Sequence, residues 1–358
     1  MPIVPLFGHA ELQTRLREAT HRGALPASML FEGPRGVGKQ RLAIWLAQFL
    51  LCREPDHAPC GHCQSCRYTA ELTHPDLHWY FPRPRLKDSD PDLATVREDY
   101  AEAIAERADA NGLYEPPSGS EGIYVATVRA LVQQSVISPA IGNRKVFIIG
   151  DAERMVPQEG SEQAANAFLK LLEEPPSDTT IVITSSESGS LLPTIRSRVA
   201  SVRVKPLRQA EVEAFLSNEA VRKRLKGEAT LPVDIADAAR LAGGAPGRLL
   251  SGAAWAQALE TAYRLIDAAT GKAAARYDAA WQMAPSKARG SFADTLDALT
   301  VALHARARSA VHQRSNAAAA GAARAMEAVE IAKERITTNV SPQLITVNLL
   351  RDLQEALT

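Results

Sequence analysis

The chain has 358 residues, of which 46% are hydrophobic and 23% charged, a length that suits two or three domains with sizeable cores. Its 41 basic residues balance 41 acidic ones, which excludes a global positive field for nucleic acid, so any contact with DNA must be local or made by partners. Residues 1–9 lack the basic segment and apolar run of a secretory signal, and no apolar stretch is long enough for a membrane span. We therefore expect a cytoplasmic protein.

A glycine-rich segment follows the first predicted strand. Residues 28–32 are typical of a short buried strand, residues 33–39 read Gly-Pro-Arg-Gly-Val-Gly-Lys, and residues 41–51 predict an apolar helix. Strand, glycine loop and helix in this order are typical of a phosphate-binding loop, where backbone N–H groups and the helix amino terminus hold an anion. The candidate nucleotide-binding residues are Gly33, Gly36, Gly38 and Lys39.

Two departures from a working nucleotide hydrolase are visible. Gln40 stands where such an enzyme needs a Ser or Thr hydroxyl to hold Mg²⁺. The strand predicted at 145–150 ends in Gly150, and Asp151 follows one residue later than the metal-supporting carboxylate should. Because strand side chains alternate between faces, this slip aims Asp151 away from a metal unless a bulge restores its direction. Asp151 and Glu153 could instead cap the next predicted helix, near 164–173. We expect no hydrolysis, while nucleotide binding stays open.

All four cysteines of the chain fall between positions 52 and 66, in the pattern C-x7-C-x2-C-x2-C. Four thiolates on such short spacers can close tetrahedrally on one Zn²⁺, and an all-sulfur shell is structural. Two disulfides are the alternative, which a cytosolic chain seldom keeps, and His57 or His62 could substitute as a ligand. The predicted zinc ligands are Cys52, Cys60, Cys63 and Cys66.

Two further blocks carry a family resemblance. Residues 165–176 read Ala-Asn-Ala-Phe-Leu-Lys-Leu-Leu-Glu-Glu-Pro-Pro, and residues 195–198 read Ile-Arg-Ser-Arg. With the cysteine cluster after the P-loop helix, these blocks resemble the bacterial DNA polymerase III clamp-loader subunits of the AAA+ superfamily, over residues 1 to about 250. The chain is more similar to the delta-prime type, whose nucleotide site is degenerate, than to the motor subunits. Three residues support this: Gln40, Gly150, and Gly247, which stands at the sensor-two arginine position.

The resemblance gives Arg198 a role. In the family this arginine is a finger that acts in trans on the γ-phosphate of ATP held by a neighbouring motor subunit, where a guanidinium stabilises transition-state charge. The family's usual Ser-Arg-Cys reads Ser197-Arg198-Val199 here, which leaves the charge unchanged. Residue chemistry alone favours a strand-end arginine that pairs with a local acidic residue.

The resemblance also implies an α/β AAA+ P-loop nucleotide-fold domain at 1–205 with the zinc module at 52–66, a small helical lid domain at 206–255, and an all-α collar domain at 256–358. Strands are expected at 28–32, 76–81, 145–150 and 179–184, alternating with helices in a parallel sheet. The polar segment 82–122, with a helix predicted over 92–109, is interpreted as a surface insertion that packs little apolar area. Ser341 or Asn339 could cap the last helix.

The function that the resemblance implies is that of a clamp-loader subunit. Such a subunit joins motor subunits of the gamma/tau type and a delta subunit in a hetero-pentamer that loads the sliding clamp onto primed DNA, with structural zinc of its own and ATP on its neighbours. One alternative is an active ATP-hydrolysing motor subunit. A second is a zinc-organised nucleic-acid-binding module that uses the basic cluster Arg83, Arg85 and Lys87.

Overall fold

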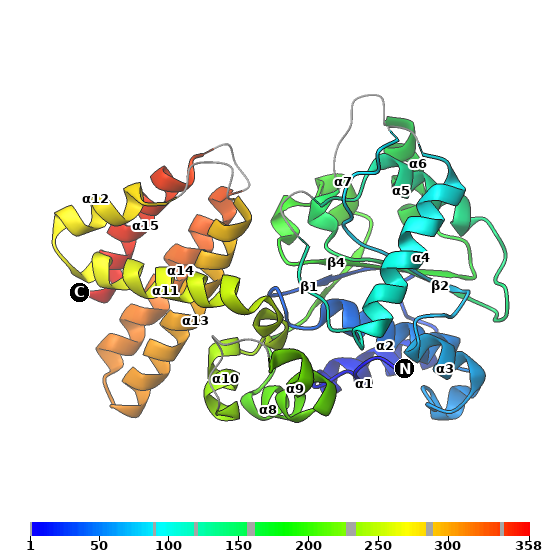
Figure 1. Cartoon of the computed structure of the whole chain (residues 1–358), viewed down its shortest axis with the longest axis horizontal. Coiled ribbons are helices and arrows are strands. Elements are labelled where there is room, and N and C mark those ends of the chain that lie inside the picture. Colours follow the sequence, from blue (N-terminus) through cyan, green and yellow to red (C-terminus); the bar gives the residue numbers. More distant parts are fainter. Residues whose placement is uncertain are drawn as a thin grey trace. The chain divides into compact units, whose positions relative to one another are not determined.

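Figure 1 shows the computed structural model of the chain. It describes residues 2–88, 91–117, 121–155, 162–226, 234–283, 289–336 and 340–358. The chain divides into two compact units, one of Met1–Lys226 with Gly244–Leu250, and one of Gly227–Gly243 with Ser251–Thr358. The boundaries 1–205, 206–255 and 256–358 stay a prediction for the domains.

The first unit is built on a parallel sheet of five strands in the order β2-β3-β4-β1-β5. Strands β3 and β4 lie inside the sheet and are buried along their whole length, as the apolar runs of a parallel sheet require. The four predicted strands form with ends that differ by at most one residue, whereas β5 was not predicted. The strands are β1 (Ser28–Glu32), β2 (Leu77–Tyr80), β3 (Lys145–Ile149), β4 (Thr179–Ser185) and β5 (Ala200–Arg203).

Helices cover this sheet. Helix α2 begins after Gly38, whose φ of 97° favours a glycine, and ends where the cysteine cluster begins. Helix α4 is capped by Asp92, which precedes it and whose carboxylate accepts a hydrogen bond from the Thr95 N–H at 2.8 Å. The helices of this unit are α1 (Ala10–His21), α2 (Lys39–Leu51), α3 (Gln64–Ala70), α4 (Leu93–Asp109), α5 (Val125–Ser135), α6 (Glu162–Glu173), α7 (Pro193–Arg196), α8 (Gln209–Ser217) and α9 (Glu219–Leu225).

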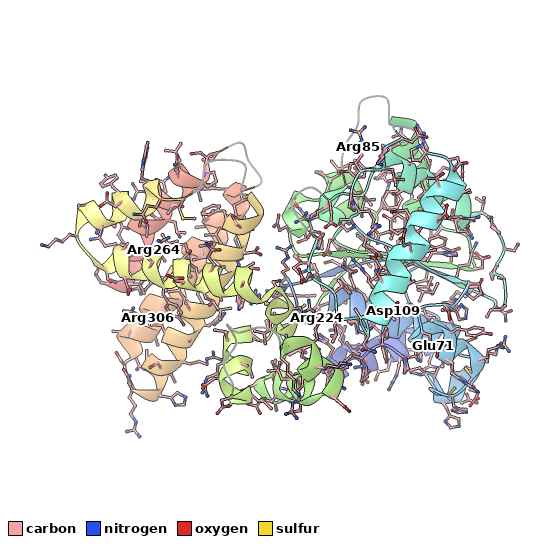
Figure 2. The ribbon with its side chains drawn as sticks, viewed as in Figure 1. Glu71, Arg85, Asp109, Arg224, Arg264 and Arg306 are labelled. Atoms are coloured by element: carbon pink, nitrogen blue, oxygen red, sulfur yellow. The ribbon has the colours of Figure 1, made fainter. Side chains whose placement is uncertain are left out.

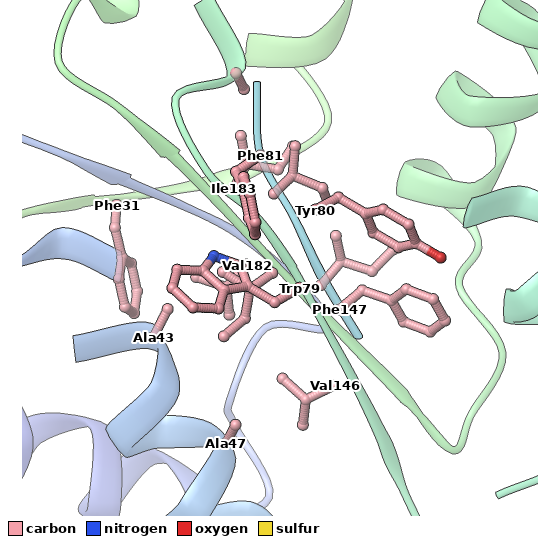
Figure 3. Close-up of a cluster of buried hydrophobic side chains, with 14 of the residues drawn as sticks. Phe31, Ala43, Ala47, Trp79, Tyr80, Phe81, Val146, Phe147, Val182 and Ile183 are labelled. Carbon is pink, nitrogen blue, oxygen red and sulfur yellow. The ribbon is translucent and has the colours of Figure 1, made fainter. Parts of the chain in front are cut away.

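The core of the first unit contains aromatic side chains from β2. Figure 3 shows Trp79 and Tyr80 leaving the strand in opposite directions, as the period of two requires. The Trp79 ring lies 5.1 Å from the Phe81 ring in an edge-on arrangement, and the Tyr80 ring lies 5.0 Å from that of Tyr100 on α4. Strand β2 is therefore packed on both of its faces.

Helix α4 packs more apolar area than the sequence of segment 82–122 predicted. The helix forms as expected, and Val96, Tyr100 and Ala103 are buried in the main core, while the rest of the helix is exposed or half-buried. The Tyr100 hydroxyl donates to the Phe81 carbonyl at 2.6 Å. Residues 89–90 and 118–120 of the segment lie outside the described residues.

The second unit is helical. Helix α15 begins at Ser341, whose hydroxyl accepts from the Leu344 N–H at 3.3 Å with Pro342 in the first turn, as predicted; Asn339 lies outside the described residues. Charged side chains such as Arg264 and Arg306 are exposed (Figure 2). None of the helices within the described ranges is long and apolar enough to cross a membrane. The helices are α10 (Ile235–Ala242), α11 (Gly252–Thr270), α12 (Ala273–Trp281), α13 (Arg289–His312), α14 (Asn316–Ile336) and α15 (Pro342–Leu357).

Candidate functional site

The loop lysine folds back onto its own loop. Lys39 Nζ donates to the carbonyl oxygens of Gly33 at 2.9 Å and Pro34 at 3.0 Å, and to the Ser186 hydroxyl at 2.8 Å. Its side chain is buried. An ammonium group has three N–H donors, so these bonds engage its full donor capacity. A bound phosphate would have to compete with them for Lys39.

Gln40 forms a buried bridge between two side chains. Its amide nitrogen donates to Asp151 Oδ2 at 2.9 Å, and its amide oxygen accepts from Trp79 Nε1 at 2.9 Å. A Cβ on Gly150 would lie 2.4 to 2.7 Å from the three amide-end atoms of Gln40. The amide therefore lies against Gly150 and binds Asp151, so the two departures from the hydrolase pattern fit together sterically.

Asp151 itself has a left-handed backbone with φ of 49°. Its side chain makes no capping hydrogen bond to the following turn, Ala152–Arg154, and its N–H donates to the Thr184 hydroxyl at 3.1 Å. The predicted slip of one residue is thus accompanied by an unusual backbone conformation that brings the carboxylate to Gln40.

Glu153 lies next to this network. Its Oε1 accepts from the Ser186 N–H at 3.0 Å, while its buried Oε2 has no hydrogen-bond partner among the described residues. Burial and the nearby Asp151 raise the pKa of Glu153 to about 7, although Lys39 opposes the shift. Ser186 joins this carboxyl to Lys39, a link that the sequence motifs do not reveal.

A turn formed by residues 244–250 packs on the glycine-rich loop, residues 33–39. The Gly247 N–H donates to the Gly36 carbonyl at 2.9 Å. A Cβ on Gly36 would lie 2.6 Å from the backbone nitrogen of Arg248, and a Cβ on Gly247 would lie 2.9 Å from the Gly36 Cα. The two backbones approach so closely that glycine is required at both positions, and an arginine at 247 would not fit this packing.

The four cysteines converge as their spacing predicts. Their Sγ atoms all lie within 4.8 Å of one another, and the Cys52–Cys63 and Cys60–Cys66 sulfur pairs are each 3.9 Å apart. All four are free thiols, so the alternative of two disulfides is wrong for this structure. A tetrahedral ion with bonds of about 2.3 Å to sulfur needs sulfur pairs about 3.8 Å apart. The arrangement fits one metal ion.

Backbone groups support this cluster. N–H groups point at three of the sulfurs, with Cys60 N donating to Cys52 Sγ at 3.5 Å and Cys63 N donating to Cys60 Sγ at 3.3 Å. Cys66 N donates to Cys63 Sγ at 3.4 Å, which caps α3. Burial raises the pKa of the Cys63 thiol, but N–H donors outweigh it and lower that pKa to about 6. Such donors stabilise thiolates, the form that binds metal.

The two candidate histidines differ. His57 is exposed. His62 is bonded through Nδ1 to the Cys60 carbonyl at 2.9 Å and through Nε2 to Glu54 Oε1 at 3.1 Å, and it forms with Glu54 and Cys60 a second group of possible ligand atoms. The four-sulfur set needs neither histidine.

Arg198 lies between α7 and β5. Its Nε donates to Glu173 Oε2 at 3.1 Å, and its Nη1 donates to the Thr194 carbonyl at 3.0 Å. The side chain of Arg198 is 30% exposed and that of Glu173 is 59% exposed. The local acidic partner anticipated as an alternative therefore exists, and the pair lies at the surface. Exposed pairs of this kind are weak, so a competing anion could release the guanidinium.

Several residues of the site were not predicted from the sequence. Trp79 and Ser186 bind Gln40 and Lys39, and Arg107 of α4 stacks on Trp79 at 4.5 Å. The signals for them are weak, because an apolar strand containing Trp79 and a polar helix containing Arg107 each read as ordinary secondary structure.

Residues 8–208, more than half of the chain, match a family model described as DNA polymerase III, delta subunit. The chain belongs to this family. A curated relative, DNA polymerase III subunit delta' of Pseudomonas aeruginosa, is 36% identical over 170 residues, which are 47% of this chain and 40% of the relative. Family and relative together identify a delta-prime-type subunit of DNA polymerase III.

A gamma/tau subunit of DNA polymerase III is also similar to this chain. DNA polymerase III subunit gamma/tau of Mycobacterium bovis is 29% identical over 213 residues, which are 59% of this chain and 30% of the relative. The chain spans less than half the length of these two curated relatives. Among solved structures, a gamma subunit-related protein of Thermotoga maritima aligns over 97% of this chain and 99% of its own, with 17% identity and a TM-score of 0.39.

Proposed function

We propose that the chain is a non-hydrolysing delta-prime subunit of a DNA polymerase III clamp loader, which helps to load the sliding clamp onto primed DNA in the cytoplasm. One observation supports the proposed absence of ATP hydrolysis. The Gln40 amide binds Asp151 and lies against Gly150, at the place where a hydrolase would hold Mg²⁺ between a hydroxyl and a carboxylate. Without that metal, attack by an oriented water on bound ATP has no electrophilic support.

Arg198 is the residue that we assign to the neighbouring ATP. Its guanidinium is partly exposed, and within the described residues it donates to the Glu173 carboxylate, the Thr194 carbonyl and the Ser197 hydroxyl. A γ-phosphate carries more charge than Glu173 and can accept two guanidinium N–H groups at once, so it would outcompete this weak pair. Arg198 then acts as an arginine finger in trans, while its own chain contributes no turnover.

The cysteine cluster takes structural Zn²⁺ in this proposal. Cys52, Cys60, Cys63 and Cys66 would supply all four ligands, leaving no open position for catalysis. The ion would fix α3 to the end of α2, where Gln48 Nε2 already donates to the Cys66 carbonyl at 3.0 Å.

The partners follow from the same proposal. Motor subunits of the gamma/tau type would bind ATP beside Arg198, and a delta subunit would complete a hetero-pentamer. Residues 206–255 would form the helical lid domain and residues 256–358 the all-α collar domain. Contacts with DNA are expected to be weak and directed at phosphates. Within the basic cluster considered above, Arg83 is paired with Asp99 at 2.8 Å, whereas Arg85 and Lys87 are exposed.

The deciding experiment is clamp- and DNA-stimulated ATP hydrolysis by a reconstituted loader. Complexes contain the wild-type chain, Arg198→Ala, or the matched control Arg196→Ala, which removes an exposed arginine two residues away. We expect Arg198→Ala to lower turnover at least about tenfold, Arg196→Ala to leave it unchanged, and the isolated chain to show none. Equal turnover in all three complexes would refute the finger.

The second candidate function is an active motor subunit, which the similarity to gamma/tau favours. The same experiment separates the two, because Mg²⁺-dependent turnover by the isolated wild-type chain would support the motor subunit and contradict the non-hydrolysing proposal.

A further inference from the structure

Arg107, near the end of α4, lies inside an aromatic cluster. Its guanidinium carbon is 3.2 Å from the ring centroid of Phe81, 3.8 Å from that of Tyr114 and 4.5 Å from that of Trp79. Its Nη1 is buried and has no hydrogen-bond partner within the described part of the chain. A guanidinium is attracted to ring faces, and such contacts strengthen when water is excluded. The cluster thus holds a cation in the interior of the first unit.

This cation is linked to the degenerate site through one shared side chain. Trp79 stacks on Arg107 and donates its indole N–H to Gln40, whose amide in turn donates to Asp151. A continuous path therefore runs from guanidinium to indole, amide and carboxylate. Burial lowers the pKa of Arg107 to about 10, while Tyr114 and Asp151 oppose that shift, so the group keeps its charge at neutral pH.

The backbone after α4 is shaped to hold this cluster. Asn111 and Gly112 have positive φ angles of 55° and 72°, which turn the chain back toward the core. The Val4 N–H donates to the Asn111 carbonyl at 2.8 Å, and a Cβ on Gly112 would lie 3.0 Å from the Ile3 side chain. The turn is fixed against the amino-terminal segment, so both Arg107 and Tyr114 are supplied by segment 82–122.

We propose that Arg107 is a built-in cation that balances the Asp151 carboxylate in place of Mg²⁺, and that segment 82–122 thereby holds the chain's own nucleotide loop in one metal-independent state. The inference goes beyond the proposed function, since it concerns this chain alone and would hold whether or not Arg198 acts on a neighbour. It gives the segment a specific task inside the first unit.

A double-mutant cycle on the full chain tests this. Arg107→Gln and Asp151→Asn are made singly and together, and amide hydrogen exchange measured by mass spectrometry follows opening of β2 and β3. We expect Arg107→Gln to raise the opening equilibrium constant at least about tenfold in the wild-type chain, and at most about threefold where Asp151 is already Asn. Arg107→Lys, which keeps the charge, should preserve most of the coupling to Asp151.

Arg17→Gln is the matched control. Arg17 lies 5.3 Å from the Trp45 ring and so is also stacked on an indole, but it comes from α1. Arg17→Gln should change the opening equilibrium constant by the same factor whether residue 151 is Asp or Asn. Coupling of Arg107 to Asp151 no larger than that of Arg17 would overturn the proposal.

If the Arg107→Gln chain does not fold, hydrogen exchange of the Asp151→Asn chain alone tests the proposal. It should speed exchange in the last turn of α4 as well as in β3, because Arg107 loses its counter-charge. Faster exchange confined to β3 would also overturn the proposal.

Discussion

The side-chain amide of Gln40 occupies the space that a side chain on residue 150 would need, with its Oε1 2.4 Å from the position of a Cβ on Gly150. Restoring a carboxylate at 150 while Gln40 remains would therefore displace the amide from Asp151 and Trp79. The two positions form one structural unit, and a single reversion toward the hydrolase pattern should be harmful.

Gly150→Ala tests that unit. The new methyl group pushes the Gln40 amide away from two hydrogen-bonded partners, so we expect a loss of about 1–3 kcal/mol in the free energy of unfolding. In a Gln40→Ser background the loss should shrink to below about 1 kcal/mol, because the shorter side chain leaves room. Urea unfolding of the four proteins measures both values, and an equal loss in both backgrounds would contradict the steric coupling.

Glu153 should make stability depend on pH. Its pKa is raised to about 7 in the folded chain, so the folded state binds the proton more tightly than the unfolded state does. The associated stability is fully present below the ordinary carboxyl pKa and is lost as the pH rises through about 7. Glu153→Gln, which cannot ionise, should be more stable than wild type at pH 8 by about 1–3 kcal/mol and should show a flatter profile between pH 5 and 8. Melting curves across this range check the prediction; parallel profiles for the two proteins would contradict it.

Metal removal should loosen a defined region. In the proposed site, an ion bound by the four sulfurs would hold α3 against the end of α2, so a strong chelator should accelerate hydrogen exchange at residues 52–70 while β3 and β4 keep their protection. Cys66→Ser, which removes the buried ligand, should reproduce the change without chelator. Metal analysis should find about one zinc per wild-type chain. A chain that carries no metal and ignores the chelator would argue against the site.

Glu173→Gln should leave the fold almost unchanged. The Arg198–Glu173 pair is exposed, and exposed pairs contribute about 0–1 kcal/mol. We therefore expect the Glu173→Gln chain to have a melting temperature within about 2 °C of wild type. Asp99→Asn is the contrasting variant and should lower the melting temperature more, because the Arg83–Asp99 pair is more buried and is held by two hydrogen bonds. A large loss on changing Glu173 would mean that Arg198 is primarily structural.

Much of the first unit could be predicted from its sequence, for a physical reason. Strands β3 and β4 are buried on both faces, and the apolar runs at 146–149 and 181–183 indicate this. The fixed spacing of the cysteines likewise indicates that they converge. The short edge strand β5 has no comparable run, since its side chains alternate between exposed and half-buried.

The interactions around Gln40 could not be predicted in the same way. They join side chains far apart in the sequence, such as Trp79 with Gln40 and Lys39 with Ser186, and no local pattern encodes such pairings. The polar composition of α4 likewise suggested a solvated helix, because Arg107 reads as a surface charge until the aromatic rings around it are seen. The loss of the hydroxyl at position 40 was visible, whereas its replacement by an amide bridge was not.

Helix α2 connects the glycine-rich loop to the cysteine cluster. It starts at Lys39, which donates hydrogen bonds to the glycine-rich loop, and stops beside Cys52, the first cysteine of the proposed zinc site. Its 13 residues form a single rod about 20 Å long. We expect a change at the cysteines, such as oxidation or exchange of a bound ion, to move this helix and with it the loop at its other end. The oxidation state and metal content of the chain should therefore be measured in any assay of that loop.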